Sequence, residues 1–204
     1  MFSYCWIILF APIAGFTILS WYGNRMSRER VGMFGCATVG LSFLVTLVAL
    51  SELLLDAEKQ KGAVSTLYNW VTAGSFSLNL SILIDPLSVF MLLIVTGVGF
   101  VIHVYSVGYM REDPEYSRFF AYMNLFIFSM SVLVMAADFF FLIVGWALVG
   151  LASYLLIGFW KEKTSAVLAA RKAFVMNVIG DVGMVIAAFM IFDHLGTLNF
   201  LDVF

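Results

Sequence analysis

One carboxylate in this sequence lies deep within a hydrophobic stretch. Asp181 follows Asn177 by four residues, so a helix would place both side chains on one face. A charged residue at the centre of a bilayer costs about 2.5–3.5 kcal/mol on insertion scales, so its presence there needs a reason. Asp181 is therefore either part of an ion or proton path or a structural carboxyl that is hydrogen-bonded across a helix interface.

His103 is the second candidate for proton chemistry, because it interrupts the apolar run Val101–Ser106. Histidine changes charge near neutral pH and can relay protons. A packed histidine that hydrogen-bonds to a neighbouring helix fits the same pattern, and the sequence leaves both interpretations open. Asp85 has a simpler interpretation. A side-chain acceptor placed before Pro86 is typical of a helix N-cap.

No motif of a soluble enzyme occurs in the sequence. It contains no G-x-G-x-x-G, no P-loop, no cysteine cluster and no Ser/His/Asp set. Cys5 and Cys36 stand in separate hydrophobic segments without the spacing of a metal or redox pair. We therefore expect no catalytic residue and no metal site in this chain.

The composition places these residues in a membrane. Of the 204 residues 63% are hydrophobic and 12% are charged, and the mean hydropathy is +1.02. A soluble domain has roughly 45–50% apolar and about 25% charged residues. The net charge of −2 is too small to indicate a nucleic-acid partner. The surface of this chain is thus expected to be solvated by lipid.

Six stretches are long and apolar enough to cross a bilayer, which takes about 20 residues each. They cover residues 4–22, 31–55, 81–109, 119–137, 139–160 and 166–192. Their apolar runs are continuous rather than alternating, which favours helices over a barrel. The expected fold is an all-α membrane protein with about six transmembrane helices, a single transmembrane domain over residues 1–204. Residues 56–80 form an outer loop in which the pattern near 75–80 predicts a short strand.

Loop charges predict the orientation. The first, third and fifth connections, together with the span ends that flank them, hold nine of the eleven basic residues, whereas Lys59 and Lys61 stand beside acidic residues in the 56–80 loop. The positive-inside rule then places the N-terminus outside, in a multi-pass protein of the cell (inner or plasma) membrane.

Four stretches together resemble a known family. They are TGVGFVIHVYS at 96–106, YSRFFAYMNLF at 116–126, GW at 145–146 followed by VGLASYLLIGF at 149–159, and KAFVMNVIGD at 172–181. They are similar to subunit L of bacterial NADH:quinone oxidoreductase, respiratory complex I, and to the large subunit of multi-subunit cation/proton antiporters. The resemblance covers essentially the whole chain.

The resemblance implies an antiporter-like subunit that moves protons while redox chemistry occurs elsewhere. NADH, FMN, iron–sulfur clusters and quinone are then bound by other subunits, and the partners are other membrane-arm subunits and the lipid bilayer. Members of the family are far longer and contain inverted repeats. The chain is accordingly expected to be an N-terminal fragment or one half of a split gene. The candidates for the proton path are Asp181, His103, Asn177 and Lys172.

Two positions depart from the family pattern. Ala147 stands where the family has a glutamate, and Val178 stands where it has an arginine. Losing both charges together is physically coherent, because removing one member of a buried charge set leaves the other uncompensated. A structural, non-conducting membrane piece is therefore one alternative function, and a subunit of a cation/proton antiporter is another.

Overall fold

Six helices of the chain are long and apolar enough to cross a membrane. The computed structural model describes residues 3–56, 62–73 and 76–203. In chain order its main helices are α1 (Trp6–Tyr22), α2 (Arg28–Leu55), α3 (Pro86–Leu92), α4 (Gly99–Tyr109), α5 (Tyr116–Val134), α6 (Phe139–Ile157), α7 (Thr164–Leu195) and the short α8 (Phe200–Val203). A π-helical segment, Leu93–Val98, joins α3 to α4, and the three form one span. The predicted six-helix membrane fold is confirmed.

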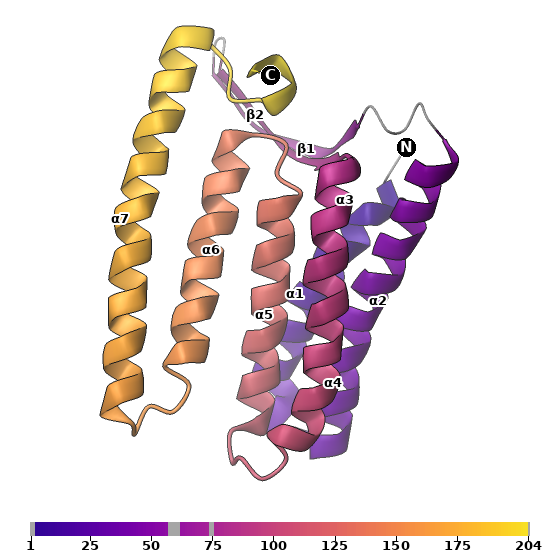
Figure 1. Cartoon of the computed structure of the whole chain (residues 1–204), viewed down its shortest axis with the longest axis vertical. Helices are drawn as coiled ribbons and strands as arrows, with labels where there is room; N and C mark the ends of the chain where they lie inside the picture. The colour runs from indigo at the N-terminus through magenta and orange to yellow at the C-terminus, as the bar shows by residue number, and fades with distance from the viewer. Residues whose placement is uncertain (1–2, 57–61, 74–75, 204) are drawn as a thin grey trace.

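The helices form a bundle with an extension on one side. α1, α2, α5 and the α3–α4 span pack against one another, α6 packs on α5, and α7 packs on α6 (Figure 1). In the described part of α7 only Ala170 and Ala188 are buried. The extension therefore leaves α7 with one covered face and a broad exposed one.

The third span begins later than the sequence indicated. Residues 81–84 belong to a strand, and the helix starts at Pro86 instead of at residue 81, where the predicted 81–109 stretch began. Asp85 is the N-cap: its carboxylate accepts from the backbone N–H of Ser88, whose hydroxyl in turn accepts from the N–H of Asp85. Proline disfavours helical geometry at the residue before it, so the strand ends and the helix starts at this pair. The predicted cap is confirmed.

The outer loop contains a longer hairpin than the pattern suggested. β1 (Ala63–Ala73) and β2 (Phe76–Ile84) pair antiparallel, with Ala63 opposite Ile84. The backbone N–H of Leu83 donates to the carbonyl of Met135 at 2.9 Å, which fastens the hairpin to the turn between α5 and α6. Lys59, Lys61 and Ser75, which entered the sequence predictions, lie outside the described residues.

The turn between α5 and α6 is covered by the chain that follows α7. Phe139 donates its backbone N–H to the carbonyl of Leu198, and Phe200 donates to that of Ala137. Asp138 is thereby 7% exposed, and its carboxylate caps α6 by accepting from Phe141 N–H at 2.7 Å. Burial raises the pKa of this carboxyl above its ordinary value, while the bond from Phe141 acts in the opposite direction. Asp138 is therefore a buried helix cap and not a solvated turn residue.

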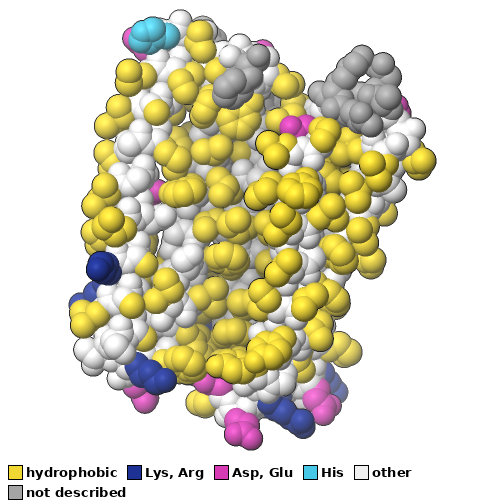
Figure 2. Space-filling model, viewed as in Figure 1, with side chains coloured by type: hydrophobic (Ala, Val, Ile, Leu, Met, Phe, Trp, Pro, Cys, Tyr) yellow, Lys and Arg dark blue, Asp and Glu magenta, His cyan; other side chains and the backbone are white. Residues whose placement is uncertain are grey.

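Two apolar clusters fill the two ends of the bundle. The cluster at the hairpin end includes Ile8, Leu53 and Met135, and the cluster at the other end includes Leu19 and Phe120. Figure 2 shows an outer face that is mostly hydrophobic, with Lys and Arg gathered toward the end opposite the hairpin. Between the two clusters the same helices carry buried polar side chains, which form the first candidate site.

Candidate functional site

His103, Asn124 and Thr38 meet in the middle of the bundle, from α4, α5 and α2. His103 and Asn124 are fully buried. The Nε2 atom of His103 lies 3.5 Å from Nδ2 of Asn124, and its Nδ1 atom lies 2.7 Å from the carbonyl oxygen of Gly99. The hydroxyl of Thr38 donates to Oδ1 of Asn124 at 2.6 Å. The structure thus places His103 in a closed hydrogen-bonded network.

A glycine of α1 makes room for this network. A Cβ atom at Gly15 would lie 2.5 Å from Oδ1 of Asn124 and 2.9 Å from Oγ1 of Thr38. The ring of Phe120 covers the imidazole of His103 edge-on, with the ring centroids 6.0 Å apart. Four helices therefore enclose the amide and the imidazole.

The second candidate site lies on the covered face of α7. Asn177 and Asp181 are both half-buried, whereas Val178 and Gly180 are exposed, so the predicted pair does share a face. The amide of Asn177 packs so closely on Gly150 of α6 that no side chain fits there. Oδ1 of Asp181 is buried and has no hydrogen-bond partner among the described residues.

The two sites are separate. His103 belongs to the bundle of α1, α2, α4 and α5, whereas Asp181 lies on α7, which packs on α6 outside that bundle. Lys172 is exposed and joins neither of them. Ala147 on α6 and Val178 on α7, the positions of the missing family charges, are both exposed in this chain. The structure therefore groups Asn177 with Asp181 and leaves His103 apart.

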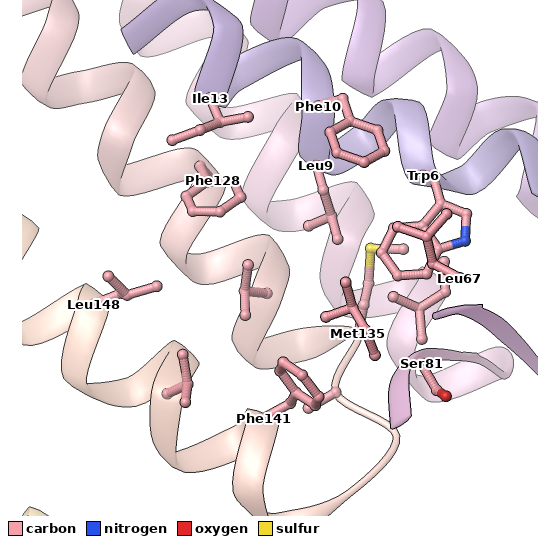
Figure 3. A pocket seen from close by; sticks show the side chains of 15 residues that line it. Trp6, Leu9, Phe10, Ile13, Leu67, Ser81, Phe128, Met135, Phe141 and Leu148 are labelled. Carbon is pink, nitrogen blue, oxygen red and sulfur yellow. The ribbon is translucent and has the colours of Figure 1, made fainter. Parts of the chain in front are cut away.

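An apolar cavity of about 330 Å³ lies between α1, the hairpin, α5 and α6. Figure 3 shows Trp6, Leu67, Met135 and Phe141 around it, with Ser81 as the one polar side chain in the lining. A cavity of this character suits an apolar group and offers nothing that would carry a proton. Among the described residues no cluster of three His, Cys, Asp or Glu side chains is suited to hold a metal ion.

Asn124 and Thr38 are functional candidates that the sequence interpretation missed. Asn124 stands inside the quoted stretch 116–126 but was not singled out. The sequence does contain a sign of its role: an isolated amide in an apolar helix needs a hydrogen-bond partner on another helix, because lipid offers none. The identity of that partner became visible only in the fold.

Two family models match the sequence. Residues 70–120 match "NADH-Ubiquinone oxidoreductase (complex I), chain 5 N-terminus", and residues 136–204 match "NADH:quinone oxidoreductase/Mrp antiporter, TM". The two matches include His103 and Asp181, respectively.

Curated relatives match nearly the whole chain. NADH-quinone oxidoreductase subunit L of Mycobacterium tuberculosis is 43% identical over 201 residues, and that of Escherichia coli strain K12 is 41% identical over 197 residues. These alignments cover 98% and 97% of this chain but 32% of either relative. The chain therefore spans about a third of the length of these relatives.

Solved structures share the fold. One is the membrane-bound sulfane sulfur reductase, an archaeal respiratory membrane complex, at a TM-score of 0.80 and 15% identity, covering 98% of this chain and 39% of that one. Another is the Mrp complex from Dietzia sp., at a TM-score of 0.80 and 23% identity, covering 98% of this chain and 21% of that one. At these identities the likeness concerns the fold alone.

The close approach at Gly15 yields a prediction. Gly15→Ala forces a methyl group against the Asn124 amide, and we expect it to destabilise the protein by about 1–3 kcal/mol, as overpacking does. Thermal unfolding in detergent measures this loss. Gly108→Ala is the matched control, because a Cβ there meets nothing within 4 Å among the described residues. Equal stability of the two variants would contradict the tight packing of α1 on Asn124.

Proposed function

Because this chain belongs to the family of NADH-quinone oxidoreductase subunit L, whose N-terminal portion it matches, we propose that it is part of a proton-translocating membrane-arm subunit. NADH oxidation and quinone reduction take place in other subunits, which hold NADH, FMN, iron–sulfur clusters and quinone. The partners of this chain are other membrane-arm subunits and lipid. Its own contribution is to move protons across the membrane.

The buried oxygen of Asp181 is the observation that supports this function best. A carboxylate in the membrane is costly unless it is paired, and Oδ1 finds no partner in the described residues. The His103 network shows that this chain can satisfy a buried polar group where its role is structural. An unsatisfied carboxyl is suited to accept a proton, a water molecule or a charge from a neighbouring segment.

We propose that Asp181 takes up and releases protons and that Asn177 positions it from one helical turn away. Asn177 is held against Gly150, so α6 fixes its position along α7. The protonation state of Asp181 then depends on the charge that faces it, and each change of charge biases the next site along the membrane. Lys172 stands nine residues earlier on α7, exposed toward the basic end, and is the outermost candidate of this path.

Replacement of Asp181 tests this assignment. Asp181→Asn in the assembled oxidoreductase should slow proton transfer through this path by about 10²-fold or more, since a positioned proton-transfer group contributes at least that much. Electron transfer from NADH to quinone and proton pumping are measured together in reconstituted vesicles. Asp193→Asn is the matched control, because Asp193 is an exposed carboxylate on the same helix. Unchanged pumping and assembly in Asp181→Asn would refute the assignment.

A structural, non-conducting role is the second candidate, and Ala147 and Val178 favour it. Both side chains are uncharged and lie on exposed helix faces, so neither can interact electrostatically with an ionisable neighbour. Under the proposed function, Ala147→Glu should raise proton flux above that of the wild type, because the added carboxylate restores a charge that shifts the proton affinity of nearby ionisable groups. Ala147→Gln is the uncharged control. Flux that is absent from wild type and variant alike would establish the structural role.

We also propose that the basic end of the bundle faces the cytoplasm. The connections α1–α2, α4–α5 and α6–α7 lie at one end, and the hairpin lies at the other (Figure 1). The basic end contains Arg118, which forms an ion pair with Glu115 at 3.1 Å and donates to the carbonyl of Phe159. Described acidic residues at the hairpin end include Asp56, Asp85 and Asp138. This asymmetry supports the positive-inside assignment.

Cysteine labelling tests the orientation. In a background without Cys5 and Cys36, His194→Cys should react with an impermeant maleimide added to intact cells, because His194 is exposed at the hairpin end of α7. Lys161→Cys, exposed at the basic end, should react only in inverted vesicles. The reverse pattern would place the N-terminus in the cytoplasm.

A further inference from the structure

The hydrogen-bond partners of His103 determine which of its nitrogens carries the proton. Nδ1 lies 2.7 Å from the carbonyl oxygen of Gly99, and a carbonyl oxygen can only accept. Nδ1 must therefore be protonated. In the neutral imidazole Nε2 then holds a lone pair, and it points toward Nδ2 of Asn124 at 3.5 Å.

The amide of Asn124 is itself fixed in orientation. Its Nδ2 donates to the carbonyl of Phe120 at 2.9 Å and lies 3.5 Å from the carbonyl of Gly35, while its Oδ1 accepts from the hydroxyl of Thr38 at 2.6 Å. Turning the amide by half a turn would set Oδ1 against the carbonyl of Phe120 and lose these bonds. The nitrogen of the amide must consequently face Nε2 of His103.

We propose that Asn124 is a positioning residue that holds His103 as the neutral imidazole protonated at Nδ1. A second proton on Nε2 would point at the amino group of Asn124, donor against donor. His103 therefore takes up no proton while Asn124 keeps this orientation. The two candidate sites then differ in kind: the imidazole is a fixed hydrogen-bond acceptor, and the carboxyl of Asp181 is the group open to protons.

No charged side chain among the described residues lies where it would favour a second proton on His103. Among the described residues no charged side chain is recorded in contact with the imidazole; Phe120 covers it, and Cys36 and Tyr116 pack in the same apolar cluster as Phe120. The remaining titratable side chains of the four helices that enclose the site are Tyr22 on α1, Arg28, Glu29, Arg30 and Glu52 on α2, Tyr105 and Tyr109 on α4, and Arg118 and Tyr122 on α5. The charged residues of α2 and α5 stand toward the helix ends, so the imidazole has the amide and the Gly99 carbonyl as its polar neighbours.

Nitrogen-15 NMR of the histidine-labelled chain in lipid bilayers tests the proposal. The sequence contains two histidines, and His194→Gln leaves His103 as the single label. At pH 7 the wild-type imidazole should show a protonated Nδ1 and an unprotonated Nε2 that accepts a hydrogen bond. This measurement needs no turnover, so its result is independent of whether the chain translocates protons.

Two substitutions at Asn124 separate positioning from packing. Asn124→Asp sets an acceptor against Nε2, and an adjacent carboxylate should raise the ratio of imidazolium to neutral imidazole by about tenfold or more. Asn124→Leu keeps the branched shape of the side chain and removes the donor, so the Nε2 signal should move to that of a nitrogen without a hydrogen bond while Nδ1 stays protonated. Asn177→Asp is the control: it makes the same change on α7, away from His103, and should leave the imidazole neutral.

The outcomes are distinct. A wild-type imidazole that is protonated at Nε2, or that is charged at pH 7, would overturn the proposal. An unchanged His103 spectrum in the folded Asn124→Asp variant would overturn it as well. If Asn124→Asp does not fold, the wild-type spectrum and the Nε2 signal of Asn124→Leu still decide the matter.

Discussion

The constraint that governs this chain is that polar groups inside a bilayer must be satisfied without water. Backbone groups meet it by forming helices, and side chains meet it by finding partners on neighbouring helices or on their own backbone. Ser42 and Thr46 on α2 each donate to a carbonyl one turn earlier on the same helix. Asn124 does more, because it joins α2, α4 and α5 through one amide. The layer of polar side chains between two apolar clusters thereby fixes how these helices are rotated about their axes.

The same constraint explains the ends of the helices. Backbone N–H groups in the first turn of a helix lack partners within the helix. A carboxylate at the N-cap accepts hydrogen bonds from them. Asp85 does this for α3 and Asp138 for α6. At Asp138 the covering segment around Leu198 and Phe200 removes water, so the cap works while buried. The hairpin is fastened at this same turn, and one compact junction holds α5, α6, β2 and the segment after α7 in place.

The sequence was sufficient for those features that depend on one segment at a time. Each apolar run indicated its own helix, the pair Asp85–Pro86 indicated its own cap, and the spacing of Asn177 and Asp181 indicated their common face. The features that it missed depend on two segments. Nothing in the local pattern places Asn124 against His103, because 21 residues and a turn separate them. The burial of Asp138 likewise depends on distant residues, because the segment that covers it comes after α7. Residues 81–84 were assigned to a helix because a short apolar run fits a helix and a strand equally well, and they adjoin a longer apolar stretch.

The contrast between the two polar sites follows from where their helices stand. α4 and α5 lie within the bundle, so the imidazole and amide are enclosed, and each has hydrogen-bond partners on neighbouring groups. α7 has α6 on one face only, and Asp181 faces that contact with an oxygen left over. A group whose partners are complete resists a change of charge, because any added proton breaks an existing bond. A group with an unfilled position changes charge at a smaller cost. The first kind of site keeps the helices in register, and under the proposed function the second kind is where charge moves.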